Sequence, residues 1–449
     1  MSDTIAALSS AHGESAVAVV RLSGPGCREI AASCFARESA PEPRRMTRAK
    51  YSALGGEVLD DVMFAFFAAP ASYTGEDMLE IFCHGNPFIV QTVLEDLFER
   101  GARAASHGEF TRRAFENRKL DLSQAEAVSL MIAARSRHSL DAARRQLEGE
   151  LSRRINSICD SLVAALAHIE AHIDFADEDL PPESYAEPLA LLKGAEADAR
   201  RLLSTCRYGA VVRDGLNVSI TGSPNVGKSS LLNALLGRDR AIVSSRAGTT
   251  RDFIVERAVI GGYCVNLTDT AGVRESLDEI ESEGIRRAIS SAEAADIRLL
   301  VVDASSGGPP CSGLLASSLD PKNTIVVLNK SDLPVRCDLS SFGGFRKVSV
   351  SCLREEGLED LKAAMLETVE SGGITPAFDD ILVSARHGEL VRVACLAAGR
   401  AADGIEAGVP AELCASEIRL ALESLGEIVG RGDNEEVLDK IFSTFCIGK

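Results

Sequence analysis

One segment restricts the possible folds of this chain more than any other. The sequence Gly222-Ser-Pro-Asn-Val-Gly-Lys-Ser229 matches the phosphate-binding loop pattern G-x-x-x-x-G-K-S, and it lies between an apolar run and a helical stretch. The glycines let backbone N–H groups face phosphate oxygens, and the helix N-terminus adds positive potential. The sequence therefore predicts a strand, a phosphate-binding loop and a helix in succession.

The residues around this loop alternate between short apolar runs and helical stretches. The strand-like runs are 216–221, 253–260, 264–268, 298–303, 324–329 and 347–351. This alternation predicts a mostly parallel sheet with helices on its faces. Gly261-Gly262, between the second and third runs, predicts a tight hairpin and hence one antiparallel edge strand.

Motifs after these runs indicate the nucleotide. Asn329-Lys330-Ser331-Asp332 ends one run, and the two carboxylate oxygens of Asp332 match the adjacent N–H donors of guanine N1 and N2, which adenine lacks. Ser351-Cys352-Leu353 follows the next run and is expected to close over the base. The order of these elements predicts a GTP-binding domain.

Other residues are expected to hold the phosphates and Mg²⁺. Lys228 is expected to reach the β- and γ-phosphates and Ser229 to bind Mg²⁺. Asp269-Thr270-Ala271-Gly272 provides a carboxylate behind the Mg²⁺ shell and an N–H group that senses the γ-phosphate. Thr250 lies between loop and sheet, where a switch segment is expected, and it is the natural ligand of both Mg²⁺ and the γ-phosphate.

The catalytic group is less obvious. Many GTPases place a Gln just after Asp-x-x-Gly to orient the attacking water, but here Val273 and Arg274 follow. Glu281 is a candidate for that role. From the residues alone, an ordinary surface Glu that opens a helix is the simpler interpretation.

The rest of the chain changes character on both sides of the GTPase segment. Residues 1–118 have strand-like runs at 17–22 and 62–67, a basic loop at 41–48 and a helical pattern at 87–100. Residues 123–173 contain no proline and a single glycine, which predicts long helices. A further helix is expected over 188–207, a linker over 371–374 and helices over 380–442.

These patterns give a multidomain fold of α/β and α parts. We expect an N-terminal α/β domain at 1–118, a helical domain formed by 119–213 and 371–449, and a Ras-like P-loop GTPase domain at 214–370 inserted into it.

Composition restricts the class of protein and its cellular location. With 48 Lys and Arg against 66 Asp and Glu, the net charge is −18, which argues against a general nucleic-acid coat protein. Residues 100–154 still hold 12 basic and 7 acidic residues, a local net of +5 that suits either tRNA phosphates or a solvated helix face. Twelve scattered cysteines without a Cys-x-x-Cys pair, no apolar run of membrane-spanning length and no signal-peptide pattern favour a cytoplasmic protein without a membrane partner.

Together with the C-terminal Phe-Cys-Ile-Gly-Lys, the motifs resemble the MnmE (TrmE) family of tRNA-modification GTPases. The likeness covers the whole chain and includes Val-Arg-Leu-Ser-Gly at 20–24, Thr-Gly-Glu-Asp at 74–77, Leu-Glu at 79–80, His-Gly at 84–85, Gly-Glu-Phe-Thr at 108–111, Lys-Leu-Asp-Leu-Ser-Gln-Ala-Glu at 119–126 and Gly-Thr-Thr-Arg-Asp at 248–252.

The resemblance implies a K⁺-dependent GTPase with a folate-binding, dimerising N-terminal domain. It also implies a heterotetramer with the partner MnmG, which carries FAD and uses NADH, and a tetrahydrofolate one-carbon unit (5-formyl or 5,10-methylene). The implied product is a 5-aminomethyl or 5-carboxymethylaminomethyl group on the wobble uridine of certain tRNAs. A regulatory or ribosome-assembly GTPase without folate chemistry is the alternative.

The family motifs carry residue roles over to this chain. The implied folate ligands are Arg21, Glu80, Lys119 and Lys449, and a carboxylate such as Glu80 suits the paired N–H donors of a pterin. Glu281 matches the catalytic Glu, which reverses the preference stated above. Cys446 is open to two interpretations, a nucleophile or a packed thiol.

The nucleotide and K⁺ ligands follow from the same motifs. The K⁺ ligands implied by the family are Asn225, Ser244, Arg246 and Thr249. The full set of expected GTP-binding residues is Asn225, Val226, Gly227, Lys228, Ser229, Ser230, Ser244, Thr249, Thr250, Asp269, Thr270, Ala271, Gly272, Asn329, Lys330, Asp332, Ser351, Cys352 and Leu353.

Overall fold

The structure, a computed structural model, describes residues 3–36, 41–174, 185–237, 255–269, 295–307, 319–371, 383–432 and 435–449. The chain divides into two compact units. The first contains Met1–Ser129, Leu147–Asn156 and Glu423–Lys449, and the second contains Leu130–Gln146 and Ser157–Leu422. The two ends of the chain therefore belong to the same unit.

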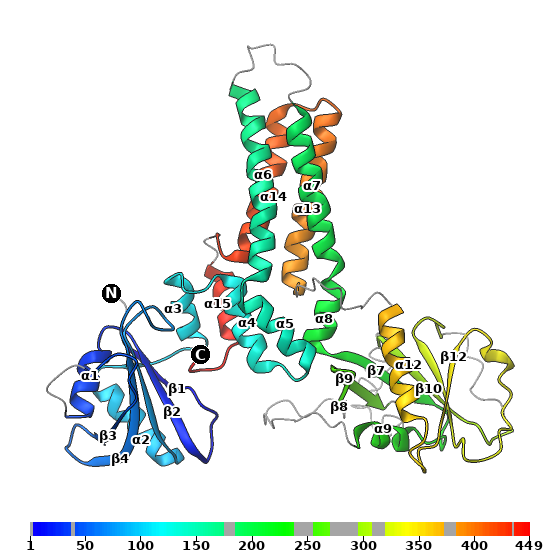
Figure 1. The fold of residues 1–449 in the computed structure, drawn as a ribbon, viewed down its shortest axis with the longest axis horizontal. Helices are drawn as coiled ribbons and strands as arrows, with labels where there is room; N and C mark the ends of the chain where they lie inside the picture. Colours follow the sequence, from blue (N-terminus) through cyan, green and yellow to red (C-terminus); the bar gives the residue numbers. More distant parts are fainter. Residues whose placement is uncertain are drawn as a thin grey trace, which may run out of the picture. The chain divides into compact units, whose positions relative to one another are not determined.

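The first unit is built on a six-stranded sheet with the order β3-β4-β5-β2-β1-β6, in which only β1 and β6 pair in parallel (Figure 1). The strands are β1 (Ile5–Leu8), β2 (Ser15–Ser23), β3 (Thr47–Ser52), β4 (Val58–Phe67), β5 (Met78–Gly85) and β6 (Arg103–Ala104). The runs predicted at 17–22 and 62–67 are confirmed. The loop predicted at 41–48 is wrong at its end, because Thr47 and Arg48 begin the edge strand β3 and pair with β4.

Helices α1 (Cys27–Cys34) and α2 (Pro87–Glu99) contribute to the core on one face of this sheet. The α2 helix confirms the pattern predicted at 87–100. It begins after Asn86, whose side chain accepts a hydrogen bond from the Phe88 N–H, and Pro87 is tolerated at the first helical position because its missing N–H would have no helical partner. Strand residues such as Val20 and Ile81 pack in this core.

The other face of the sheet packs against α3 (Glu109–Glu116), which contributes Phe110 to a small cluster with Ile5 and Ala7 of β1. Helices α4 (Leu122–Ala133) and α15 (Glu435–Ser443) form a neighbouring cluster that contains Phe442 and Phe445. The last residues of the chain are therefore anchored by apolar side chains before the terminal tetrapeptide begins.

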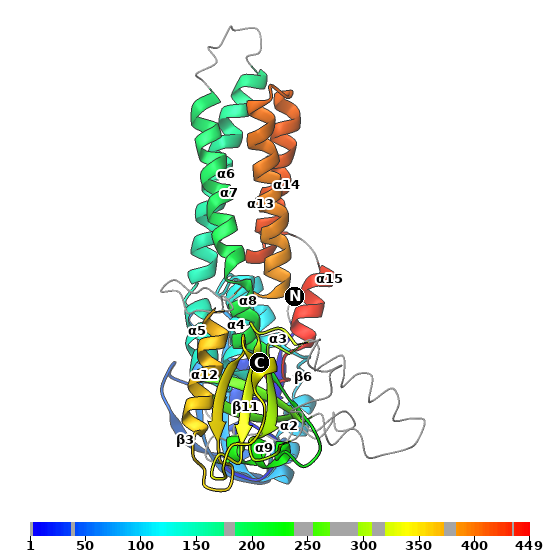
Figure 2. The same ribbon diagram turned by 90° about the vertical axis from the view of Figure 1, so that its right-hand side faces the viewer.

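The second unit contains long helices and a second sheet. The remaining helices of the helical part are α5 (Arg137–Leu147), α6 (Glu150–Asp174), α7 (Ala186–Ser204), α8 (Cys206–Asp214), α13 (Ala385–Glu406) and α14 (Ala411–Val429). Within this unit α7 packs along α13, and α6 and α14 run beside them (Figure 1 and Figure 2). The helices predicted over 123–173, 188–207 and 380–442 are confirmed within the described residues.

The second sheet has the order β12-β11-β10-β7-β9-β8. Its strands are β7 (Leu216–Gly222), β8 (Val255–Ile260), β9 (Tyr263–Asp269), β10 (Ile297–Asp303), β11 (Thr324–Asn329) and β12 (Arg346–Val350). All neighbours are parallel except β8 and β9, which form the hairpin predicted at Gly261-Gly262. The six predicted strands and the single antiparallel edge are thus confirmed.

Two layers of apolar side chains cover this sheet. One contains residues of α9 (Lys228–Leu236) and α12 (Leu358–Ser371), and the other includes Phe342 of the short 3-10 helix η2 (Ser340–Phe342). The central strands β10 and β11 are buried on both faces, which explains their nearly continuous apolar sequence.

Candidate functional site

The loop between β7 and α9 has the backbone that its sequence predicts. Gly227 has a φ of +99°, and a Cβ on it would lie 2.2 Å from the side-chain nitrogen of Asn329. Lys228 opens α9, is buried, and donates from Nζ to the carbonyl oxygens of Gly222 and Ser223 at 3.1 and 2.8 Å. The ammonium group is therefore held against the backbone of its own loop.

The motifs predicted to recognise guanine meet at the ends of β11 and β12. Asn329 donates to the carbonyl oxygen of Val226 at 2.8 Å and accepts from the Cys352 N–H at 3.3 Å. The Ser351 hydroxyl donates to Asp332 at 2.7 Å, and this hydrogen bond lowers the pKa of Asp332. Three segments that are far apart in the sequence are thereby fixed together, with an ionised carboxylate among them.

Lys330 joins the carboxyl end of β10 to the phosphate-binding loop. Its Nζ contacts Asp303 and lies 3.4 Å from the carbonyl oxygen of Asn225, which has a left-handed φ of +63°. Burial alone would raise the pKa of Asp303, but hydrogen bonds from Lys330 and Ser305 hold it below its ordinary value. Leu353 is 86% exposed, so it leaves the predicted base-closing loop open to solvent.

Several predicted nucleotide ligands lie at or beyond the edges of the described segments. Asp269 ends β9, as predicted, next to β7 in the sheet. Outside the described residues lie Ser244, Arg246, Thr249, Thr250, Thr270, Ala271, Gly272 and Glu281.

The first unit gathers three of the four residues predicted to bind folate. Arg21 of β2 and Glu80 of β5 are direct partners in the sheet register, and Arg21 Nε and Nη2 lie 2.9 and 2.8 Å from Glu80 Oε1. The guanidinium carbon of Arg21 lies 5.7 Å from the Tyr73 ring centroid and 5.8 Å from that of Phe110, within the range of cation–π attraction.

The C-terminal tail, residues 446–449, supplies the third predicted residue. The N–H groups of Gly108 and Phe110 donate to the carbonyl oxygens of Cys446 and Lys449 at 3.4 and 3.2 Å. The Gly448 carbonyl oxygen accepts from the Ser9 hydroxyl at 2.9 Å and lies 3.5 Å from Arg21 Nη1. Burial, and then the charge of Arg21, lower the pKa of Lys449.

Lys119, the fourth predicted residue, lies against a different segment. Its Nζ donates to the Pro70 carbonyl oxygen at 3.0 Å, and its side chain passes close to Gly75. No contact joins it to Arg21, Glu80 or Lys449 among the residues that the structure describes.

Sequence reasoning missed the groups that surround these residues. Tyr73 and Phe110 flank Arg21, and His107 donates a hydrogen bond from Nδ1 to the Phe445 carbonyl oxygen at 2.8 Å. Phe110 belongs to the Gly-Glu-Phe-Thr motif at 108–111, and His107 directly precedes it. This motif was the sequence feature that could have pointed to both residues. Their relation to Arg21 and the tail depends on tertiary packing.

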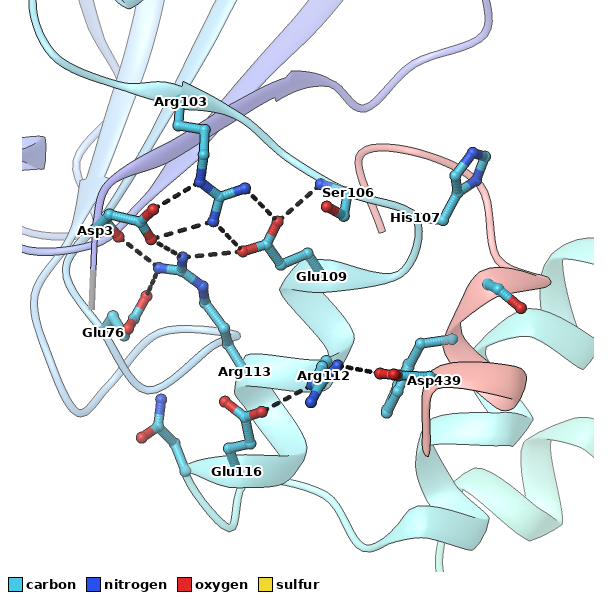
Figure 3. A pocket seen from close by; sticks show the side chains of 13 residues that line it. Asp3, Glu76, Arg103, Ser106, His107, Glu109, Arg112, Arg113, Glu116 and Asp439 are labelled. Carbon is cyan, nitrogen blue, oxygen red and sulfur yellow. Dashed lines mark hydrogen bonds and ion pairs between the residues drawn. The ribbon is translucent and has the colours of Figure 1, made fainter. Parts of the chain in front are cut away.

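A polar pocket of about 670 Å³ adjoins α3 (Figure 3). Its wall contains an ion-pair cluster in which Arg103 and Arg113 bind Asp3 and Glu109, and Arg113 also binds Glu76. Hydrogen bonds from Arg103 are the main reason that the pKa of Asp3 is held at about 2. The arginines on this wall are therefore compensated by carboxylates, and none was predicted from the sequence.

The parallel sheet, the phosphate-binding loop and the joined Asn329, Asp332 and Ser351 segments define a P-loop guanine-nucleotide-binding protein. Two protein families match the chain: the MnmE helical domain over residues 122–446 and the N-terminus of the GTP-binding protein TrmE over residues 4–119. The chain belongs to the MnmE family of tRNA modification GTPases, a family of GTP hydrolases that act in tRNA modification.

Full-length relatives agree with this assignment. The chain is 49% identical to the tRNA modification GTPase MnmE of Opitutus terrae, with 100% of this chain and 99% of the relative covered. It is 43% identical to that of Akkermansia muciniphila and 41% identical to that of Aquifex aeolicus, with at least 99% of each chain covered. In the part of the chain that the structure describes, no helix has the length and apolar character needed to cross a membrane.

Proposed function

We propose that this chain is a K⁺-dependent GTPase that uses a tetrahydrofolate one-carbon unit, together with the FAD- and NADH-dependent partner MnmG, to modify the wobble uridine of certain tRNAs. The product would carry a 5-aminomethyl or 5-carboxymethylaminomethyl group. The observation that carries the folate part is the docking of the C-terminal tail beside the Arg21–Glu80 pair. The proposed setting is the cytoplasm.

The proposed nucleotide chemistry uses the loops at the carboxyl ends of the second sheet. Support comes from the buried Lys228 above its loop and from the Asp332 carboxylate that Ser351 holds ionised. In this proposal Lys228 and Ser229 face the phosphates and Mg²⁺, with Thr250 as the second Mg²⁺ ligand. Bound Mg²⁺ neutralises charge that develops on the phosphate oxygens.

A monovalent cation is proposed to replace the arginine finger of other GTPases. Asn225 would contribute its side-chain oxygen, and Ser244, Arg246 and Thr249 would complete the K⁺ site. One positive charge there would offset the charge that builds between the β- and γ-phosphates. Glu281 would orient the attacking water through a bridging water, because a carboxylate next to the γ-phosphate would be repelled.

The proposed folate site fits the chemistry of its donor set. Glu80 presents a carboxylate for the paired N–H donors of a pterin, and Lys449 supplies a half-buried ammonium group for an anionic group. A Cβ on Gly448 would lie 2.2 Å from the Leu8 carbonyl oxygen, so the tail reaches this position only because the residue is glycine. Lys119 would bind at the edge of the site, and Cys446 is kept as a possible participant in the modification chemistry.

We further propose a homodimer formed through the face of the first sheet that carries Arg21 and Glu80, beside α3, with MnmG completing a heterotetramer. The strand register places Met63 and Phe82 on the same face as Arg21 and Glu80, and Met63 is 39% exposed. An apolar sheet face beside a ligand site is suited to a second copy of the chain. The proposed domain bounds are 1–118, 119–213, 214–370 and 371–449.

Binding of 5-formyl-tetrahydrofolate to the purified full-length chain tests this function. Isothermal titration calorimetry should show saturable binding, and Glu80→Gln should weaken it by at least about tenfold because a charged hydrogen-bond acceptor is lost. Glu57→Gln, an exposed position in the turn between β3 and β4, is the matched control and should bind like the unmodified chain. No binding by the unmodified chain would favour a regulatory or ribosome-assembly GTPase without folate chemistry.

A further inference from the structure

The segment between β4 and β5, residues 68–77, is attached to α3 at three places. The Tyr73 hydroxyl lies 2.9 Å from Thr111 Oγ1, and Asn117 Nδ2 donates to the Thr74 carbonyl oxygen at 2.7 Å. The third attachment is the ion pair between Arg113 and Glu76, whose closest atoms are 3.0 Å apart. This segment, called the 68–77 loop below, is therefore held by α3 and its C-cap residue over residues 73–76.

Arg113 is the buried charged residue among these attachments. Its side chain is 8% exposed, and it lies between the carboxylates of Asp3, Glu76 and Glu109 (Figure 3). It also donates to the Asp3 carbonyl oxygen at 2.8 Å. A buried guanidinium needs such partners to offset its lost hydration, so its position and that of Glu76 are closely linked.

Glu76 also joins the loop to the strand that carries Arg21. Its Oε2 accepts a hydrogen bond from the Ser23 hydroxyl at 2.8 Å, and Ser23 lies 2.7 Å from Thr74 Oγ1. Ser23 and Thr74 are fully buried. Because Ser23 lies two residues after Arg21 in β2, these bonds fix the loop relative to the Arg21 side of the sheet.

The consequence appears at Arg21. Glu80 engages the Nε and Nη2 edge of the guanidinium, and the Tyr73 ring lies beside the same group. The other hydrogen-bond acceptor near it, among the described residues, is the Gly448 carbonyl oxygen at 3.5 Å from Nη1. This arrangement leaves the outer Nη1 and Nη2 edge available for an anionic group or a carbonyl oxygen of a ligand.

We propose that Tyr73 orients the Arg21 guanidinium toward a bound one-carbon carrier, and that Glu76 and Arg113 are positioning residues that hold Tyr73 in place. The inference rests on the proposed folate-binding function and adds a specificity-determining residue to that site. In this proposal Arg113 and Glu76 act on Arg21 through the 68–77 loop. A flat, anionic ligand is selected because the ring fixes the plane in which the Arg21 donors lie.

A double-mutant cycle separates this role from general stabilisation of the fold. The full-length chain and its Tyr73→Leu, Glu76→Gln and doubly substituted variants are titrated with 5-formyl-tetrahydrofolate by calorimetry. Each single variant should bind about tenfold more weakly, as expected for loss of one partly buried cation–π contact. The double variant should also bind about tenfold more weakly, because Glu76 acts through Tyr73 and the two effects are not additive.

Two further variants serve as controls, and a third is held in reserve for the cycle. Tyr73→Phe keeps the ring and should bind within about twofold of the unmodified chain. Glu116→Gln breaks a different Arg–Glu pair of α3, that with Arg112 at 2.9 Å, and should bind normally. If Glu76→Gln does not fold by circular dichroism, Asn117→Ala replaces it in the cycle, because it releases the loop at Thr74 without changing a charge.

The possible outcomes are distinct. If the two losses of affinity multiply, the double variant should bind about a hundredfold more weakly than the unmodified chain. That result would overturn the positioning role, because independent effects multiply. Unchanged affinity in Glu76→Gln or in Tyr73→Leu would overturn it as well. If the unmodified chain binds no 5-formyl-tetrahydrofolate, the proposed function fails and this inference falls with it, whereas failure of the inference alone requires normal binding by the unmodified chain.

Discussion

Gly448 gives a direct test of the position of the C-terminal tail. Its φ is +91°, and a Cβ would lie 2.2 Å from the Leu8 carbonyl oxygen and 3.0 Å from the Ser9 Cα. For Gly448→Ala, the left-handed backbone alone costs about 1–2 kcal/mol. The contact with Leu8 adds to this cost, because both atoms nearest the new methyl group belong to the backbone and cannot rotate away.

A cost of about 1.4 kcal/mol shifts the equilibrium between docked and detached tail by tenfold. We therefore expect Gly448→Ala to weaken binding of 5-formyl-tetrahydrofolate by at least about tenfold. The amides of Gly108 and Phe110, which donate to tail carbonyl oxygens, should lose protection from hydrogen exchange by a similar factor. Calorimetry and hydrogen–deuterium exchange measure the two effects independently.

Gly408→Ala is the matched control. Gly408 has a similar φ of +70°, but a Cβ there would meet nothing within 4 Å, and the residue lies in the second unit. Gly408→Ala should introduce similar backbone strain but should change neither folate binding nor hydrogen exchange of the Phe110 amide. Unchanged exchange and unchanged affinity in Gly448→Ala would refute the docked position of the tail.

Three further predictions concern hydrolysis, RNA and acid stability. Asn225→Ala should bind GTP but lose its acceleration by K⁺, and Glu281→Ala should hydrolyse GTP at least about tenfold more slowly, a barrier increase of about 1.4 kcal/mol; equal rates in Na⁺ and K⁺ would contradict the cation mechanism. Replacing the exposed Arg137 and Arg144 of α5 by Gln should weaken tRNA binding and flatten its salt dependence in a filter-binding series, and an unchanged salt slope would leave a solvated helix face. Burial alone would raise the pKa of Asp96, but hydrogen bonds from Arg100 and Tyr51 lower it, and the pKa of Asp3 is about 2. Because the unfolded chain then binds more protons, the free energy of unfolding of the first unit should be highest above about pH 4 and should fall toward about pH 2. Urea titrations should show a shallower fall in Asp96→Asn. A free energy of unfolding that rises from about pH 4 to about pH 2 would contradict these pKa shifts.

The sequence predicted the second sheet closely because its central strands are buried on both faces. Runs such as Leu299 to Val302 are apolar without interruption, and Gly261-Gly262 permits few conformations other than a tight turn. The first sheet was harder to predict. The edge strand β3 has the polar sequence Thr-Arg-Ala-Lys-Tyr-Ser, in which only Tyr51 is fully buried, so it resembles a loop.

The candidate folate site shows what local patterns cannot supply. Arg21 and Glu80 came from family motifs, and their pairing across β2 and β5 follows once the register is known. Tyr73, Phe110 and Arg113 were missed because their importance depends on α3 packing beside the 68–77 loop. The contact of Gly448 with Arg21 joins residues 427 positions apart, and no pattern within either segment indicates it.

Measurement of modified nucleosides in tRNA tests most directly the central claim that this chain acts in wobble-uridine modification through its C-terminal tail. Cells that lack this protein should lose the modified wobble uridine from a subset of tRNAs, as measured by mass spectrometry of digested tRNA, and the full-length chain should restore it. A chain that ends after Phe445 should hydrolyse GTP but fail to restore the modification, because Cys446 to Lys449 form one side of the proposed folate site. Restoration of normal nucleoside levels by this shortened chain would contradict the account.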